Sequence, residues 1–357
     1  MFRMTFVCGN PFPKNMRWAL LLLLASLTWT QQAAPATQLQ SKTRDNARHQ
    51  VSEYQVSEYQ VSVTNVTYHG WPNSLILSNG KVEVVVVPAI GRVMQFRFVR
   101  EDGPFWENRA MDGKAPNPAA KEWSNFGGDK SWPSPQADWQ KITGRGWPPP
   151  VAFDAMPDHS NTHGGVVELV SAVDPSFGIR TRRRVELDYQ KPIMTITTTY
   201  EKVSGRPMKV GIGVITQLRD PQRAFMVLPP KSRFPQGYVR LRFDPPHDLK
   251  VEDGLVSLTR DNTQSQIGSD ANTLLWMDEK YVVRIDSSRV RGAEYADEGT
   301  NATIYTGANP DAYVELETFG PLSLMKTGNK IQRRNVYTLL QRQEKDPFAE
   351  AKRVLGQ

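Results

Sequence analysis

The chain has 357 residues, of which 39% are hydrophobic and 23% charged, and its formal net charge at pH 7 is +7. A chain of this length can bury one large core or two smaller ones, and its dispersed basic residues argue against a nucleic-acid partner. Its only cysteine is Cys8, so the rest of the chain has no disulfide, no thiol nucleophile and no cysteine-based metal site.

Residues 1–36 have the pattern of a secretory signal peptide. An apolar run, A-L-L-L-L-L-A-S-L-T-W at positions 19–29, is too short to span a bilayer. It is preceded by a positively charged region that contains Arg3, Lys14 and Arg17. This order of charged and apolar segments predicts export rather than a transmembrane helix.

Cleavage of the signal is expected after the small-residue sequence A-P-A at positions 34–36. Loss of the three basic residues lowers the formal charge from +7 to +4. Met1 and Met16 both fit as the true start, and an uncleaved anchor is the alternative to cleavage. We therefore expect an exported protein, periplasmic or extracellular, with no stable membrane span after cleavage.

Residues 37–63 are predicted to form a polar leader. The leader contains the sequence V-S-E-Y-Q twice in succession, at positions 51–60. Side chains alternate between the two faces of a strand, so a five-residue repeat cannot present both copies on the same face. We interpret the repeat as a local duplication without chemistry of its own, and we expect at most its second copy to join the first strand.

Residues 64–357 are predicted to form a single β-rich domain. Segments rich in β-branched and aromatic residues, separated by turn signals, predict strands over 75–78, 81–87, 93–99, 165–171, 179–189, 193–201, 208–218, 238–243, 254–259, 273–285, 303–305, 312–319 and 335–341. One helix is predicted near the end of the chain, with Asp346 as its N-cap, Pro347 as its first residue and Gly356 after its last turn. A dozen or more strands without helical crossovers predict an all-β, antiparallel sandwich and exclude a parallel α/β fold.

Residues 100–160 interrupt this strand pattern with many prolines. Five of the nine tryptophans lie between Trp106 and Trp147, around the run N-F-G-G-D-K-S-W-P-S-P-Q at 125–136. The glycines and prolines of this run favour a long loop over a regular strand or helix. Indole rings beside Asn, Asp, Lys and Gln favour a sugar-binding wall, whereas a loop that only closes one end of the sandwich is the simpler alternative.

Two further groups of residues are candidates for proton transfer. In Y-V-E-L-E-T-F at 313–319, strand periodicity places Tyr313, Glu315 and Glu317 on one face, which fits either an acid–base site or a solvated sheet face. His159 and His163 are the only closely spaced histidines, and the sequence places no third metal ligand beside them. We expect no metal and no cofactor, since the glycines at 211–213 precede no helix and do not form a phosphate loop.

Several segments, in this order, resemble a family of exported bacterial proteins of unknown function. They are L-S-N-G-K-V-E-V-V-V-V-P-A-I-G-R-V-M-Q-F, F-W-E-N, N-F-G-G-D-K-S-W-P-S-P-Q, F-G-I-R-T-R-R-R-V-E-L, V-I-T-Q-L, E-Y-A-D-E-G-T-N-A-T-I-Y-T-G and A-Y-V-E-L-E-T-F-G-P-L. The resemblance covers roughly residues 70–342. It implies a galactose-mutarotase-like β-supersandwich, the fold of the aldose 1-epimerase superfamily, in which many members bind carbohydrates.

The resemblance also implies acid–base chemistry at an anomeric centre. In aldose 1-epimerases a late-strand Glu removes the proton of the anomeric hydroxyl, and a His protonates the ring oxygen. That Glu corresponds to Glu315 or Glu317. The comparable mid-chain stretch reads V-I-T-Q and ends at Gln217, so no His stands where these enzymes carry it, and only His163 is left as a candidate acid.

The sequence therefore predicts a cleft for a mono- or oligosaccharide, with Glu315, Glu317 and His163 as candidate catalytic residues. The expected binding residues are Arg92, Asn125, Asp129, Lys130, Trp132 and Gln217. Three interpretations remain open: an epimerase-type isomerase, a non-catalytic sugar-recognition protein, and a structural envelope protein.

Overall fold

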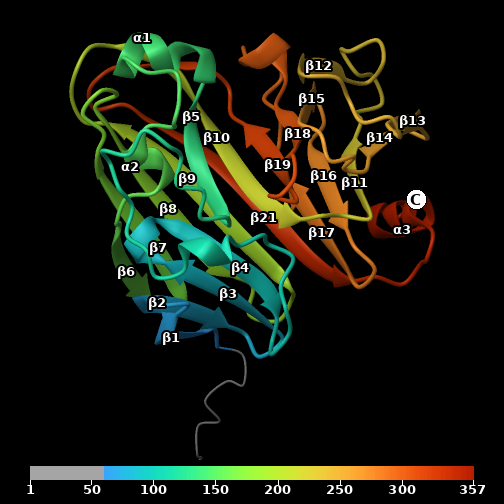
Figure 1. Ribbon diagram of the computed structural model, residues 1–357, viewed down its shortest axis with the longest axis horizontal. Helices are drawn as coiled ribbons and strands as arrows, with labels where there is room; N and C mark the ends of the chain where they lie inside the picture. The colour runs from blue at the N-terminus through green and yellow to red at the C-terminus, as the bar shows by residue number, and fades with distance from the viewer. Residues whose placement is uncertain (1–59) are drawn as a thin grey trace, which may run out of the picture. The chain divides into compact units, whose positions relative to one another are not determined.

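The computed structural model describes residues 60–357 (Figure 1). The predicted signal peptide at 1–36 lies outside the described residues, as does all of the predicted leader except residues 60–63. The first strand, β1 (Ser62–Tyr68), begins at the end of the duplicated sequence, two residues before the predicted start of the domain.

One sheet of eleven strands carries the site described below. Its adjacent strands follow the order β1, β2 (Trp71–Ser78), β3 (Val82–Val87), β4 (Arg92–Phe98), β5 (Asp129–Ser134), β10 (Met208–Arg219), β19 (Tyr313–Phe319), β18 (Ala302–Thr306), β15 (Ser265–Ser269) and β12 (Val239–Arg242). The remaining strand, β20 (Ser323–Met325), pairs with one end of β10. Every pairing in this sheet is antiparallel.

The second sheet has ten strands. Its order is β13 (Lys250–Glu252), β14 (Leu255–Leu258), β11 (Arg223–Val227), β16 (Thr273–Met277), β17 (Tyr281–Asp286), β21 (Lys330–Gln341), β9 (Ile193–Lys202), β8 (Ile179–Leu187), β7 (Val166–Val173) and β6 (His159–His163). These pairings are antiparallel too. The prediction of an all-β antiparallel sandwich is therefore confirmed, and a parallel α/β fold is excluded for the described residues.

The main hydrophobic core joins the inner faces of the two sheets. Val84 and Leu316 enter it from the eleven-strand sheet, and Ile196 and Val283 enter it from the ten-strand sheet. Because side chains alternate along a strand, the residues on either side of Leu316 lie on the other face of their sheet. That outer face carries the polar residues of β19, and the long segment between β4 and β6 packs against it.

The segment between β4 and β6 contains the main departure from the sequence-based prediction. The run 125–136 was expected to be irregular, but its residues 129–134 form β5 in the middle of the eleven-strand sheet. Burial and pairing explain the difference: β5 is buried along its whole length, pairs with β10 from Asp129 to Ser134 and pairs with β4 at Asp129. These contacts outweigh its low strand propensity. Short helices follow it, α1 (Trp139–Thr143) and α2 (Val151–Asp154).

Most other predicted elements agree with the structure. The predicted strand at 273–285 is two strands, β16 and β17, separated by a turn, whereas β1, β6, β11, β13, β15 and β20 were not predicted. The terminal helix α3 (Pro347–Leu355) is as predicted: the Asp346 carboxylate accepts a hydrogen bond from the Ala349 backbone N–H at 2.8 Å, and Gly356 follows in the left-handed conformation. Four single 3₁₀ turns complete the structure, η1 (Pro88–Ile90), η2 (Arg109–Met111), η3 (Gln136–Asp138) and η4 (Asp297–Gly299).

Among residues 60–357, no helix has both the length and the apolar character that a membrane span requires.

Candidate functional site

The floor of the candidate site is set by the register of three adjacent strands, β5, β10 and β19. Ile215 of β10 lies opposite Lys130 on one side and Glu317 on the other, and Gln217 lies opposite Glu315. Directly opposed residues of an antiparallel pair share a face of the sheet. The register therefore gathers Lys130, Glu315 and Glu317 on the outer face. Lys130 and Glu315 meet there although they are almost 190 residues apart in the sequence.

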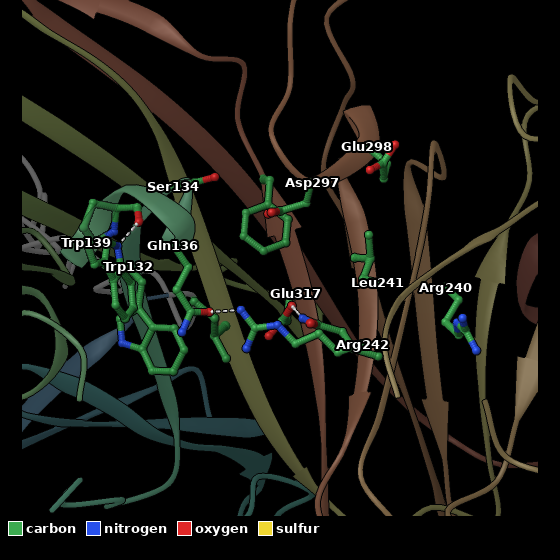
Figure 2. Close-up of a pocket in the computed structure, with 14 residues that line it drawn as sticks. Trp132, Ser134, Gln136, Trp139, Arg240, Leu241, Arg242, Asp297, Glu298 and Glu317 are labelled. Carbon is green, nitrogen blue, oxygen red and sulfur yellow. Dashed lines mark hydrogen bonds between the residues drawn. The ribbon is translucent and has the colours of Figure 1, made fainter. Parts of the chain in front are cut away.

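Two adjoining cavities lie over this floor. The Tyr313 cavity has a volume of about 420 Å³ and is lined by Trp123, Asn125, Trp147, Phe243, Gln264, Tyr305, Asp311, Tyr313 and Glu315. The Phe319 cavity has a volume of about 200 Å³ and is lined by Pro133, Ser134, Trp139, Ile215, Arg240, Leu241, Asp297, Glu298 and Phe319 (Figure 2). Both are also lined by Trp132, Gln136, Arg242, Gln266 and Glu317, so they form one continuous cleft.

Glu317 lies buried at the junction of the two cavities. The Gln266 side-chain amide donates a hydrogen bond to its Oε2 at 2.9 Å, and the Thr303 hydroxyl donates to the same oxygen. Burial, followed by the charge of Glu315, raises the pKa of Glu317 to about 8. Glu317 therefore keeps its proton near neutral pH and can donate it.

Lys130 provides the positive charge beside this carboxyl pair. Its Nζ lies 3.4 Å from Glu315 Oε1 and is completely buried. The same Nζ lies 5.0 Å from the centre of the Trp132 ring and 5.6 Å from that of Trp123. Burial outweighs the nearby carboxylates and lowers the pKa of Lys130 to about 8.

A cluster of four indoles forms one wall of the cleft. The centres of the Trp123 and Trp132 rings are 5.8 Å apart, Trp139 lies 5.8 Å from Trp132, and Trp147 lies within 6.4 Å of the other three. Most of these pairs meet edge to face, the arrangement that aromatic quadrupoles favour. Trp147 is 47% exposed, so this cluster both packs on itself and presents a ring at the cleft rim.

A buried ion pair behind the wall fixes two of these indoles. Arg92 Nη2 donates to Asp154 Oδ1 at 2.9 Å. The same carboxylate accepts the indole N–H of Trp132 at 2.8 Å and that of Trp123 at 2.9 Å. Arg92 also donates to the Gly127 carbonyl at 2.6 Å, which ties the N-F-G-G turn to the wall. Arg92 was expected to bind the ligand, but it lines neither cavity and acts on the site through Asp154.

The two glycines of this turn permit β5 to approach the neighbouring backbone. Gly127 and Gly128 have φ angles of 91° and 70°. A Cβ added to Gly127 would lie 2.3 Å from the Trp106 carbonyl oxygen, and one added to Gly128 would lie 2.6 Å from that of Val93. Glycine is needed here for both reasons.

Asp129 faces away from the cleft. Its carboxylate accepts hydrogen bonds from the Thr216 and Tyr337 hydroxyls, each at 2.6 Å, and is ion-paired with Arg183. Thr216 and Tyr337 belong to different sheets, so this completely buried group links the two layers. The alternation of β5 explains the position, because Asp129 precedes Lys130 and must point to the opposite face.

The structure thus brings together five of the predicted residues, Asn125, Lys130, Trp132, Glu315 and Glu317, and places Gln217 beside Glu315. Both side-chain amide atoms of Gln217 are buried without a hydrogen-bond partner, with Tyr313 as a close polar neighbour. His163 lies on β6 at the edge of the ten-strand sheet and lines neither cavity. No histidine of residues 60–357 lines the cleft.

Sequence reasoning missed Gln266, Thr303, Tyr305 and Arg242. Gln266 and Arg242 come from the short strands β15 and β12, which carry no recognisable motif. Thr303 and Tyr305 lie on β18 within E-Y-A-D-E-G-T-N-A-T-I-Y-T-G, one of the segments that carry the resemblance, and they alternate there as Glu315 and Glu317 do on β19. In the described part of the chain, no three His, Cys, Asp or Glu side chains are placed to hold a metal ion.

Comparison with solved structures identifies the fold. A galactose mutarotase-like protein from Lactobacillus casei matches with a TM-score of 0.52 at 9% identity, over 75% of this chain and 100% of that one. The Slr1438 protein of Synechocystis matches at 0.50 with 12% identity, over 77% and 99%. A candidate mutarotase from Salmonella typhimurium matches at 0.50 with 10% identity, over 79% and 94%. Searches against protein-family models and against curated proteins gave no match.

Proposed function

We propose that this chain, which has the galactose-mutarotase-like fold, binds carbohydrate in the cleft and interconverts sugar anomers by acid–base chemistry. The observation that carries this proposal is the buried Glu315–Glu317 pair beneath a wall of indoles. Two carboxyl groups with different surroundings can divide the tasks of acid and base. An aromatic wall with polar groups beside it suits a sugar, whose C–H face stacks while its hydroxyls form hydrogen bonds.

In the proposed reaction Glu315 is the base and Glu317 the acid. Glu315 accepts the proton of the anomeric hydroxyl while Glu317 donates its proton to the ring oxygen, and the bond between the anomeric carbon and the ring oxygen breaks. The open-chain aldehyde recloses on its other face by the reverse transfers. Hydroxyl and ring oxygens share one carbon, so adjacent carboxyl groups can reach both, and the pair supplies the acid that His163 does not.

The test is anomer exchange, followed by NMR with freshly dissolved α-glucose, α-galactose and other aldoses. We expect the protein to accelerate exchange of at least one aldose, and both Glu315→Gln and Glu317→Gln to lower the rate by about 10²–10⁴-fold. Glu294→Gln is the control, because Glu294 is an exposed carboxylate paired with Lys209 outside the cleft. Equal rates with and without protein for every aldose would exclude this catalysis.

The absence of a histidine from the cleft favours a second candidate, a sugar-recognition protein without catalysis. This candidate predicts a sugar-dependent rise in melting temperature with no exchange above the uncatalysed rate. Asn125→Ala should then weaken binding, because Asn125 lines the cleft and its buried Nδ2 has no hydrogen-bond partner. A complete lack of sugar binding would leave only a structural role.

For each of these candidate functions, we also propose that the chain is exported.

A further inference from the structure

The cleft offers two places for a ring rather than one. The Tyr313 cavity, at about 420 Å³, falls within the range of about 300–1,000 Å³ typical of small-molecule sites. The Phe319 cavity, at about 200 Å³, is smaller than typical small-molecule sites, so we interpret it as an extension of the Tyr313 cavity. They meet at Glu317, where the Arg242 guanidinium donates to Gln136 Oε1 at 2.9 Å across the cleft (Figure 2).

Each cavity is lined by a residue that has a buried polar atom without a partner. Asn125, whose Nδ2 is unpartnered, lines the Tyr313 cavity, and Ser134, whose Oγ is unpartnered, lines the Phe319 cavity; both residues are more than nine-tenths buried. Buried polar groups are nearly always hydrogen-bonded, so an unpartnered one in a cavity wall indicates a group that a ligand satisfies. Because each cavity wall contains one residue with such an atom, we expect the ligand to extend into both cavities.

Each cavity also has a strained stretch of backbone on its wall. Phe243, at the rim of the Tyr313 cavity, has a φ of 55° and is 55% exposed. Asp297 and Glu298, at the wall of the Phe319 cavity, have φ angles of 47° and 59°. Left-handed backbone raises the free energy of a non-glycine residue, and residues in this conformation are frequent at ligand-binding sites. Phe243 thus presents an aromatic ring to solvent at a cavity that the half-exposed Trp147 also lines, and a sugar can stack on either ring.

We propose that the ligand of this cleft is a carbohydrate of at least two linked rings, one in the Tyr313 cavity and one in the Phe319 cavity, with their linkage beside Glu317. This inference rests on the proposed carbohydrate binding, and it replaces a free monosaccharide by a disaccharide or longer chain as the preferred ligand. The first ring stacks between Phe243 and Trp147. The second ring lies over Phe319 and hydrogen-bonds to Ser134.

Isothermal titration of the full chain with matched sugars tests the proposal: glucose with maltose and cellobiose, and galactose with lactose. We expect at least one disaccharide to bind at least tenfold more tightly than its monosaccharides. Phe243→Ala and Ser134→Ala should each weaken that disaccharide by about three- to tenfold, the effect of one or two modest contacts. Phe243→Ala should weaken a monosaccharide held in the Tyr313 cavity to the same extent, whereas Ser134→Ala should leave that monosaccharide's affinity unchanged, because the two residues contact different rings.

Leu324→Ala is the control, since Leu324 is 61% exposed on β20 and lines neither cavity. Thermal unfolding of each variant separates loss of binding from loss of folding. Equal affinity for monosaccharide and disaccharide, with monosaccharide binding intact, overturns the two-ring ligand and leaves the proposed function standing. If none of these sugars nor maltotriose or cellotriose binds, the carbohydrate proposal and the two-ring ligand fail together.

Discussion

At the scale of single residues, the protonation of the cleft decides the proposed chemistry. Burial raises the pKa of Glu317 and lowers that of Lys130, each to about 8, so both groups change charge in the same narrow range. Burial is the largest cause of both shifts, and the charge of Glu315 adds to the shift of Glu317 but opposes that of Lys130. Activity that needs a protonated Glu317 should therefore decline as the pH rises above about 8.

The raised pKa of Glu317 also predicts how stability depends on pH. Between its ordinary pKa of 4.5 and about 8, the native state binds this proton more tightly than the unfolded state. Its stabilising effect is complete below pH 4.5 and is lost as the pH rises through 8. Glu317→Gln removes this titration, so its free energy of unfolding relative to wild type should increase by at least about 1.4 kcal/mol from pH 5 to pH 8.

Denaturant unfolding of both proteins at several pH values measures this difference. Glu294→Gln, which alters an exposed carboxylate, should give a curve parallel to that of wild type. A constant difference between Glu317→Gln and wild type across this range would contradict the raised pKa.

Asp129 illustrates how one strand position separates a binding role from a structural one. Asp129→Asn leaves the buried Arg183 guanidinium without its carboxylate and should destabilise the protein by about 3–5 kcal/mol. Urea or guanidinium unfolding measures the loss, with Asp253→Asn as the control, because Asp253 forms an exposed ion pair worth less than about 1 kcal/mol. If Asp129→Asn leaves stability unchanged but weakens sugar binding, Asp129 has a ligand-binding role instead of a structural one.

At the scale of elements, the tryptophan-rich segment is positioned by one buried ion pair behind it. The Arg92–Asp154 pair connects β4 with α2, and through two indole N–H groups it orients the wall of the cleft. The wall therefore depends on a carboxylate that lines neither cavity. Asp154 is a positioning residue in this sense.

Asp154→Asn should loosen this wall. Each indole N–H would lose a charge-assisted acceptor, and Arg92 would be left buried without a carboxylate. We expect a changed tryptophan emission spectrum, at least tenfold weaker sugar binding and a lower melting temperature. Asp346→Ala is the matched control: loss of the α3 cap should cost about 1 kcal/mol but leave tryptophan emission and sugar binding unaltered. An unaltered spectrum in Asp154→Asn would contradict the positioning role.

At the scale of the whole molecule, local patterns predicted most strands and the sandwich, because alternation along each strand reflects one buried face. The same alternation placed Glu315 and Glu317 together. Alternation did not predict β5, because the sequence K-S-W-P-S has no strand pattern of its own. This strand is stabilised by pairing with neighbours from distant parts of the chain. The predictions for Arg92 and Asp129 failed because composition identifies polar residues near a site but cannot show which face they occupy.

Export is the prediction that belongs to the intact chain. We expect a tagged protein expressed in a bacterial host to appear in the periplasm or medium, with a new N-terminus after Ala36. Mass spectrometry of the purified protein identifies that terminus, and replacement of three leucines within 19–29 by arginine should retain the chain in the cytoplasm. An intact N-terminus on a membrane-bound protein would indicate an uncleaved anchor instead.

The pairing of β5, β10 and β19 has a consequence for biosynthesis. Lys130 and Trp132 leave the ribosome long before Glu315 and Glu317, and β19 ends at residue 319 of 357. Until then β10 lacks its β19 partner on one side, and Lys130 lacks its ion-pair partner Glu315. The cleft is thus among the last parts of the molecule to be completed, and a nascent chain that stops before β19 cannot hold a ligand to help it fold.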